Sequence, residues 1–224
     1  MIRGEQIEIS SDFKADPDIS KLIQPFHDEL QTKIKTVLCF SPRVLSREES
    51  PLESSLGNFY ADVCYTTADS IFFKENGSHI DFALFNYGGI RTSIPKGVIR
   101  VNDIFKLMPF ENKLIVAQLS GEKVLELLNY LERSKLAHPI SGIRLSLEDG
   151  HLSTIKIQGE TFNAQKTYWV LTHDYLQHGG DNMSFFTDPI DLFPTDIKVR
   201  DALINHLVTI DTLKTTLDNR FSQK

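Results

Sequence analysis

The stretch that decides the fold is Asn86-Tyr87-Gly88-Gly89-Ile90-Arg91. It follows a run in which Ile80, Phe82 and Leu84 alternate with the residues between them, and this pattern predicts an extended strand. Glycines have no Cβ atom, so the chain can turn tightly there and a ligand can come close. The arginine then offers a planar, permanently charged group of donors. Taken alone the motif has a plainer interpretation, because paired glycines after a strand most often form only a turn.

Two later segments combine a regular element with an unusual loop. In residues 101–112, Pro109 restricts its own φ and disfavours helix at the preceding residue, which predicts that Phe110 lies on a fixed turn. Residues 174–182 read Asp-Tyr-Leu-Gln-His-Gly-Gly-Asp-Asn and follow the strand-like run Tyr168–Thr172. This is again a strand that leads into an aromatic residue, paired glycines and a carboxylate. The two segments together favour a ligand site over unrelated turns.

These three motifs resemble the C-terminal domain of the 5'-nucleotidase / UDP-sugar hydrolase family. The resemblance is carried by Gly-Gly-Ile-Arg at 88–91, Pro-Phe-Glu-Asn at 109–112 and Tyr-Leu-x-x-Gly-Gly-Asp at 175–181, in this order. It runs from about Leu52 to about Asp188. In that family this domain grips the nucleoside part of a nucleotide. A separate N-terminal metallophosphoesterase domain holds the metal ions and cuts the phosphate ester.

The sequence lacks the ligand motifs of that catalytic half. Two metal ions about 3.5–4 Å apart need a bridging carboxylate and several imidazoles, but the chain has no His-x-His and no Gly-Asn-His. Its one Asp-x-His, residues 149–151, is predicted to be a hairpin turn. We therefore expect no catalytic residue, metal ligand or cofactor in this chain. The resemblance implies two divalent metals in a partner metallophosphoesterase, either a separate chain or a domain from which this half was cut.

Composition and charge exclude several other classes of partner. The formal net charge of −6 argues against nucleic-acid polymers and anionic membranes, which need a basic face, and no apolar run is long enough to span a membrane. Cys39 and Cys64 match no metal or disulfide pattern and are predicted to be buried thiols. The polar start from Met1 to Glu5 shows no signal peptide. Because the family is typically exported, the resemblance implies a periplasmic location with the targeting segment absent from this chain, and composition leaves a cytoplasmic location open.

The order of elements predicts an α+β fold, a mixed sheet with helices packed on it, as in the C-terminal domain of the family. Residues 1–50 are predicted to be an N-terminal arm and helix that are part of the same domain, and residues 51–224 the nucleotide-binding domain. The first helix should begin after Asp18 as N-cap, with a possible kink at Pro25. Apolar periodicity further predicts helices that begin near residues 53 and 121 and at 199–207, and strands at 37–40, 80–85, 98–101, 114–119, 143–147, 152–157 and 168–172.

The resemblance implies a set of substrate-binding residues, namely Asn86, Gly88, Gly89, Arg91, Phe110, Asn112, Tyr175, Gly180 and Asp181. Phe110 and Tyr175 would sandwich the base, and such stacking contributes about 1–3 kcal/mol per base. Tyr175 stands where phenylalanine is more usual in the family and keeps the aromatic face. A core position is the alternative for both aromatic residues.

The polar members of the set have implied roles and alternatives as well. Arg91 would bind the ribose or lie near the phosphate, or else form a surface ion pair. Asp181 would accept hydrogen bonds from the ribose hydroxyls, or else belong only to a turn. Asn86 would bind the base or form an Asx turn. The cluster of His173, Asp174, His178 and Asp181 fits no standard set of metal ligands.

One departure from the family affects the functional prediction. Family members often carry a further arginine just before the helix at Leu56, but Leu52 and Glu53 stand there in this chain. That donor is lost unless Arg43 or Arg47 reaches the site. The leading prediction is the substrate-binding half of a 5'-nucleotidase, holding a purine nucleotide in nucleotide catabolism. The alternative is a non-catalytic nucleoside- or nucleotide-binding or scaffold protein that keeps only the fold.

Overall fold

The computed structural model describes residue 4 and residues 6–224. The chain divides into two compact units, Met1–Thr36 and Val37–Lys224. Residues 1–50 are predicted from the sequence to be an N-terminal arm and helix of the same domain as residues 51–224, and this assignment stays a prediction. Residues 37–50 lie in the second unit.

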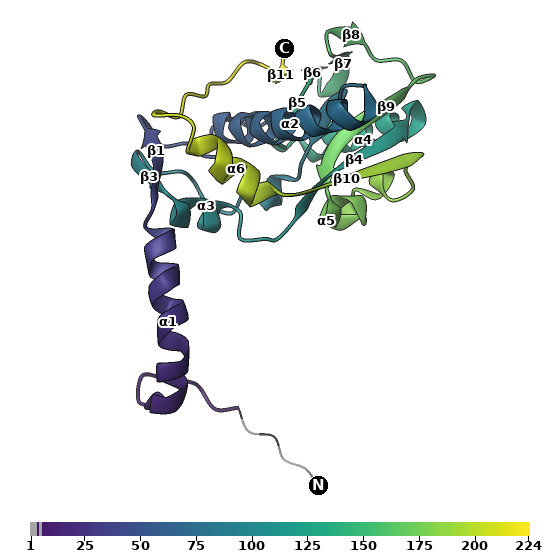
Figure 1. The fold of residues 1–224 in the computed structure, drawn as a ribbon. Coiled ribbons are helices and arrows are strands. Elements are labelled where there is room, and N and C mark those ends of the chain that lie inside the picture. Colours follow the sequence, from purple (N-terminus) through teal and green to yellow (C-terminus); the bar gives the residue numbers. More distant parts are fainter. Residues whose placement is uncertain (1–3, 5) are drawn as a thin grey trace. The chain divides into compact units, whose positions relative to one another are not determined.

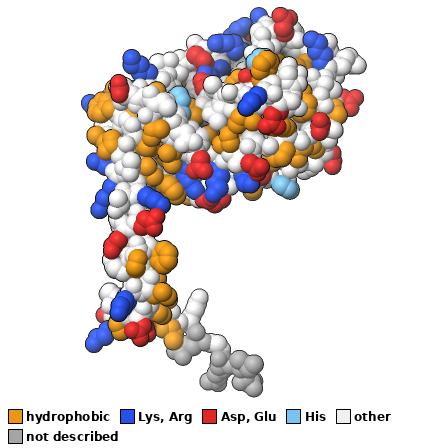
Figure 2. All heavy atoms as spheres, in the orientation of Figure 1, with side chains coloured by type: hydrophobic (Ala, Val, Ile, Leu, Met, Phe, Trp, Pro, Cys, Tyr) orange, Lys and Arg blue, Asp and Glu red, His pale blue; other side chains and the backbone are white. Residues whose placement is uncertain are grey.

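The described part of the first unit contains helix α1, Pro17–Ile34. Its N-cap is Asp16 and not Asp18 as predicted, because the Asp16 carboxylate accepts hydrogen bonds from the N–H groups of Asp18 and Ile19 at 2.9 and 3.1 Å. Pro17 then occupies the first turn, where its missing N–H costs nothing. Pro25 lies inside this helix. Figure 2 shows apolar side chains along α1, interspersed with charged ones.

The second unit is built on a five-stranded sheet with the strand order β10-β4-β9-β2-β5. The central strand, β9, pairs parallel with β2, and the other neighbouring strands pair antiparallel. The predicted α+β fold with a mixed sheet is therefore confirmed. The strands are β2 Phe82–Leu84, β4 Lys113–Ser120, β5 Ile140–Ser141, β9 Thr167–His173 and β10 Asp191–Lys198. All of them except β2 are labelled in Figure 1.

Helices cover both faces of this sheet, because alternate strand residues bury opposite faces. Phe82 packs in one apolar cluster with the inner side of α4, Gly121–Ser134. The next residue, Ala83, packs in a second cluster with α2, Ser55–Asn76, and α6, Val199–Leu207. The sheet is thus the middle layer of the unit.

The helices begin where short polar residues provide caps. The Ser54 hydroxyl accepts a hydrogen bond from the Gly57 N–H at 3.0 Å and caps α2, and Ser120 caps α4. Helix α3, Val101–Leu107, ends before Pro109, because a proline disfavours helix at the preceding residue. Asp103 stabilises its start from inside the first turn, since its carboxylate accepts from the Arg100 N–H at 2.8 Å.

Two smaller sheets complete the unit. The turn at Asp149 and Gly150 has φ values of 52° and 84°, which confirms the predicted two-residue hairpin. The hairpin joins a four-stranded sheet, β11-β6-β7-β8, and β1 pairs antiparallel with β3. The strands are β1 Val37–Ser41, β3 Gly97–Arg100, β6 Ile143–Glu148, β7 His151–Ile157, β8 Glu160–Thr161 and β11 Phe221–Gln223.

The sequence analysis missed strands β10 and β11. Strand β10 contains Pro194, which is tolerated because β10 is an edge strand and does not need every N–H for pairing. Strand β11 depends on the buried Arg220, whose guanidinium donates to both carboxylate oxygens of Asp62 at 2.7 and 2.9 Å. Such long-range pairing leaves no local pattern.

The two cysteines and the helices also bear on the predictions made from composition. Cys39 and Cys64 are free and buried, as predicted. No helix in the described part of the chain is long and apolar enough to cross a membrane. On the face drawn in Figure 2, acidic and basic side chains are interspersed.

Candidate functional site

The three motifs meet at one end of the central sheet. Strands β2 and β9 run parallel, so their carboxyl ends lie together. Strand β4 is antiparallel to β9 and pairs Leu114 with His173, so the start of β4 reaches the same end. The loop after β2, the loop before β4 and the loop after β9 therefore come together. This topology brings Gly88, Phe110 and Tyr175 to one place although they lie far apart in sequence.

A cavity of about 290 Å³ lies among these loops. Its lining contains eight of the nine predicted site residues, Asn86, Gly88, Gly89, Arg91, Phe110, Asn112, Tyr175 and Asp181. The ninth, Gly180, lies against the Tyr175 ring, and a Cβ atom at this position would overlap that ring. The structure thus brings the predicted set together, and ligand binding by these residues stays a prediction.

The two aromatic side chains are available at the cavity. Phe110 is 40% exposed and Tyr175 is 48% exposed, so neither is a core residue. Phe110 lies on the irregular segment between α3 and β4, as its proline neighbour predicts. Tyr175 lies in the short helix α5, Asp174–Gln177, directly after β9. Both rings leave apolar area for a flat ligand.

Arg91 belongs to the cavity and, among the described residues, forms no ion pair. Its guanidinium carbon lies 6.0 Å from the centroid of the Phe110 ring. One amino group donates to the Gly88 carbonyl at 3.3 Å. The remaining N–H donors are positioned for an anionic or hydroxyl-bearing ligand.

A chain of hydrogen bonds connects the polar residues at the base of the cavity. The Asn112 amide nitrogen lies 3.2 Å from His173 Nδ1, and His173 Nε2 lies 3.2 Å from the Asn86 amide oxygen. Asn86 then donates to the Asp181 carboxylate at 2.7 Å. The Tyr175 hydroxyl donates to the second oxygen of Asp181 at 2.9 Å. Asp181 is therefore held in place before any ligand arrives.

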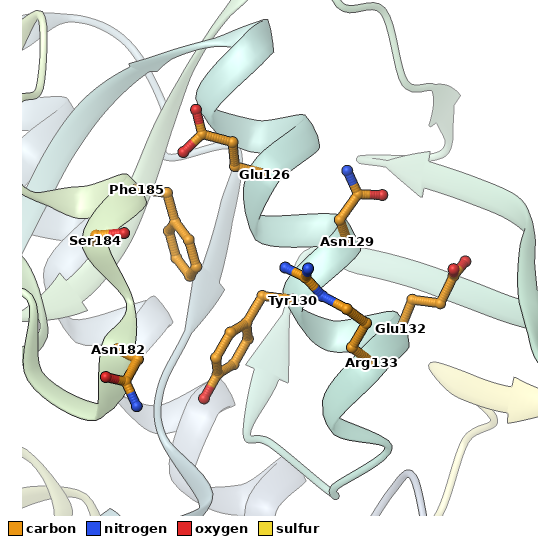
Figure 3. A pocket seen from close by; sticks show the side chains of 8 residues that line it. All are labelled: Glu126, Asn129, Tyr130, Glu132, Arg133, Asn182, Ser184 and Phe185. Carbon is orange, nitrogen blue, oxygen red and sulfur yellow. The ribbon is translucent and has the colours of Figure 1, made fainter.

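The backbone around Asp181 is also unusual. Asp181 and Asn182 both have positive φ, 53° and 60°, a conformation that few residues other than glycine adopt. The Tyr130 hydroxyl, from α4, donates to the Asp181 carbonyl at 3.2 Å and supports this turn. Figure 3 shows Tyr130 beside Phe185 and Asn182, at a second hollow of about 410 Å³. The turn that carries Asp181 thus contacts Tyr130 in that hollow.

Neither of the two candidate replacements for the lost arginine lines the cavity. Arg47 donates to the carbonyls of Tyr87 and Ile90, at 3.1 and 2.6 Å, and its guanidinium lies 4.3 Å from the Tyr87 ring centroid. Arg43 donates to Glu49 and to the Thr215 carbonyl. Arg47 therefore stabilises the glycine loop by hydrogen bonds to its backbone, and Arg43 binds the backbone of the C-terminal segment.

Arg200 is a supporting residue that the sequence analysis missed. It lies in α6 and is only 5% exposed. Its guanidinium donates to the carbonyls of Met108 and Phe110, each at 3.3 Å, and forms an ion pair with Glu111. Lys198 is a second cationic partner of Glu111, and the two contacts lower the pKa of Glu111 to about 2. Arg200 therefore fixes the segment that carries Phe110 on both sides of the aromatic residue.

His173 was considered in the sequence only as part of an unlikely metal cluster. In the structure its ring is buried among the cavity residues, and His178 Nδ1 instead lies 2.6 Å from the Asp174 carbonyl. In the described part of the chain, no three His, Cys, Asp or Glu side chains are grouped so as to hold a metal ion. The signal for His173 in the sequence is its place at the end of a buried strand, directly before the Tyr175 motif.

Two buried histidines make stability depend on pH. Burial lowers the pKa of His138 and of His173 to about 4. In the unfolded chain a histidine titrates near pH 6.5, so between about pH 6.5 and 4 the unfolded state binds more protons. The free energy of unfolding should therefore decrease as the pH falls through this range. Urea unfolding between pH 7 and pH 5, above most carboxylate titrations, measures the effect.

Matched variants identify the residues responsible for this pH dependence. His173→Asn and His138→Asn should each flatten the dependence of the unfolding free energy on pH. His27→Asn should leave it unchanged, because His27 is exposed on α1. Equal pH dependence in all three variants and the original chain would contradict this assignment.

Comparison with known proteins agrees with the fold. Residues 32–188 match the family described as "5'-nucleotidase, C-terminal domain". This match covers more than half of the chain and includes every predicted site residue. The chain therefore belongs to the 5'-nucleotidase C-terminal domain family.

Individual relatives are considerably longer than this chain. A 5'-nucleotidase of Vibrio cholerae is 25% identical over 196 residues, which is 84% of this chain and 34% of that protein. A trifunctional nucleotide phosphoesterase of Bacillus subtilis is 29% identical over 81% of this chain and 13% of its own length. The crystal structure of a 5'-nucleotidase precursor from Thermus thermophilus has a TM-score of 0.76 and 21% identity, covering 91% of this chain and 42% of its own. The chain thus spans about a third or less of the two curated relatives.

Proposed function

We propose that this chain is the substrate-binding half of a 5'-nucleotidase. It holds the nucleoside part of a purine nucleotide while a separate dimetal phosphoesterase, a chain or a domain, hydrolyses the phosphate ester in nucleotide catabolism. The observation that carries this proposal is one cavity where two exposed aromatic rings, an arginine that forms no ion pair with the described residues, and a carboxylate held by two hydrogen bonds meet. Membership of the family supports the same role.

The chemistry of the cavity suits a nucleoside. Phe110 and Tyr175 offer apolar faces to the base, whose stacking tolerates different bases. Asp181 retains lone pairs beyond its two protein partners and is oriented to accept hydrogen bonds from sugar hydroxyls. Arg91 provides positive charge for the sugar or the adjoining phosphate. Apolar area with few convergent polar groups is the usual composition of a small-molecule site.

The catalytic metals belong to the proposed partner. Hydrolysis of a phosphate ester needs a metal-activated water and stabilisation of charge on the phosphate. The described residues form no metal-binding cluster, and the relatives named above extend well beyond the region they share with this chain. We infer that a metallophosphoesterase contacts this unit so that the phosphate of the bound nucleotide reaches its metals. An exported, periplasmic location is part of this proposal.

One observation favours the alternative of a non-catalytic binding or scaffold protein. The arginine that family members often carry before α2 is absent, and Arg43 and Arg47 are engaged elsewhere. Phe110 and Tyr175 are exposed and not packed into the core, which argues against a collapsed pocket. In this alternative the protein therefore still binds a nucleoside, but no nucleotide is hydrolysed.

Calorimetric titration and phosphate release test the proposal together. The chain should bind adenosine and AMP with a Kd of about 1 µM to 1 mM, which is the range in which the KM values of enzymes usually lie. Phosphate release from AMP is measured with the chain alone, a metallophosphoesterase partner alone and the mixture, each with Mn²⁺ or Zn²⁺. We expect turnover to rise only in the mixture.

Each other outcome has a definite meaning. Binding without any gain in turnover supports the non-catalytic alternative. Absence of binding to both ligands contradicts the proposed function. Robust metal-dependent turnover by this chain alone contradicts the assignment of the metals to a partner.

A further inference from the structure

We propose that His173 is a positioning residue that fixes the orientation of the two side-chain amides of the cavity, Asn86 and Asn112. The inference about orientation concerns the free protein. Its consequence for ligand choice rests on the proposed function.

The polarity of the hydrogen-bond chain follows from its carboxylate end. Ionised Asp181 can only accept hydrogen bonds, so Asn86 must present its NH₂ group to it, 2.7 Å away. The Asn86 amide oxygen then faces His173 Nε2, so this ring nitrogen must carry the proton and donate, at 3.2 Å. His173 Nδ1 is left as an acceptor. Asn112 must therefore donate to it through its NH₂ group, also at 3.2 Å.

Packing keeps the His173 ring in this position. The side chain is 1% exposed and lies at the end of β9. The Phe85 and Tyr175 rings lie against it, with centroids 5.8 and 6.1 Å from its own. Burial lowers the pKa of His173 to about 4, so the ring is neutral near pH 7 and can act as donor and acceptor at once. A protonated ring would direct an N–H towards the NH₂ group of Asn112.

The fixed polarity gives the two asparagines different roles. Asn86 makes a hydrogen bond to a protein partner with each of its amide atoms and so supports Asp181. Its second N–H and the second lone pair of its oxygen are still available, so the base contact predicted from the sequence stays a prediction. Asn112 has its nitrogen bound to His173, and its amide oxygen makes no hydrogen bond within the described residues. An oxygen acceptor in the cavity favours a ligand with an N–H donor. With this oxygen facing the substituent at C6 of the purine, the expected preference is for a 6-amino purine, as in adenosine, over a 6-oxo purine, as in inosine.

Nuclear magnetic resonance of the free protein tests the orientation directly. The ¹⁵N shifts of the His173 ring at pH 7 should report a protonated Nε2 and an unprotonated Nδ1. In His173→Phe, which keeps an aromatic ring but offers no partner, the side-chain NH₂ signal of Asn112 should move to the position of a free amide. A protonated Nδ1, or an unchanged Asn112 signal in this variant, would overturn the proposal.

Ligand titration separates positioning from a merely structural role. His173→Phe should weaken adenosine binding about tenfold, the effect of leaving a buried polar group without its partner, and should reduce the preference for adenosine over inosine. His173→Gln, whose amide again offers one donor and one acceptor, should restore both the affinity and the preference to within about threefold, well inside the tenfold loss. Thr172→Val is the control, because this neighbouring buried hydroxyl has no hydrogen-bond partner among the described residues.

The outcomes for His173 and for the proposed function can be told apart. If the Phe and Gln variants lose affinity equally and lose thermal stability equally, His173 has only a structural role and the proposal is wrong. If the Phe variant binds adenosine like the original chain, it is wrong as well. If the original chain binds neither nucleoside, the proposed function fails, while the ring and amide signals still decide the orientation of His173 and Asn112.

Discussion

Replacing both Phe110 and Tyr175 by alanine is expected to abolish measurable adenosine binding. Stacking on an aromatic ring contributes about 1–3 kcal/mol per base. If the two rings act independently, the double variant loses about 2–6 kcal/mol, which corresponds to a weakening of roughly 30-fold to more than 10⁴-fold. Both side chains are about half exposed, so their truncation creates no cavity in the core and should leave the fold intact. Calorimetric titration of each single variant and of the pair measures the loss.

Two controls give this experiment its meaning. Phe73→Ala removes an aromatic ring that is 47% exposed but stacks on His79 in another part of the unit, so it should not change adenosine affinity. Tyr175→Phe keeps the stacking face and removes only the hydroxyl that donates to Asp181. It should therefore bind far better than Tyr175→Ala. Alanine variants that bind as well as the original chain would show that the two rings do not hold the base.

The site could be predicted from the sequence to the extent that its residues lie in local motifs. Gly88, Phe110 and Tyr175 are each part of a short pattern in which a strand or a proline fixes the position of the next loop. Glycine pairs and an X-Pro step have conformational consequences that do not depend on the rest of the fold. The structure brings these loops together because β4, β9 and β2 are neighbours in the sheet.

The supporting residues could not be predicted in the same way. Arg200 acts on Phe110 across 90 residues of sequence, and nothing near Arg200 indicates this contact. His173 has a role only because its two ring nitrogens face Asn86 and Asn112, which come from other strands and loops. Strand β11 is similar, since it pairs with β6 through a contact between distant segments. Hydrophobic periodicity reports local burial, whereas these features depend on long-range geometry.

The variant Arg200→Met is expected to lower both stability and ligand affinity. Methionine fills a similar space but cannot donate to the carbonyls of Met108 and Phe110, which Arg200 reaches at 3.3 Å each. Loss of these hydrogen bonds to a buried cation should lower the free energy of unfolding by about 2–4 kcal/mol. Urea unfolding measures this change. Since Phe110 lies on the released segment, adenosine affinity should fall as well, even in samples that remain fully folded.

Lys198→Met is the matched control because Lys198 shares one partner with Arg200. Both cations contact Glu111, but Lys198 is exposed and donates to neither carbonyl. If the effect of Arg200 came only from its ion pair with Glu111, the two methionine variants would behave alike. If it comes from the two carbonyls on either side of Pro109, only Arg200→Met will destabilise the unit and weaken adenosine binding. Glu111 is exposed and keeps Lys198 as a cationic partner when Arg200 is replaced. The two carbonyls, in contrast, accept a side-chain hydrogen bond from no described residue other than Arg200. We therefore expect that only Arg200→Met will destabilise the unit and weaken binding.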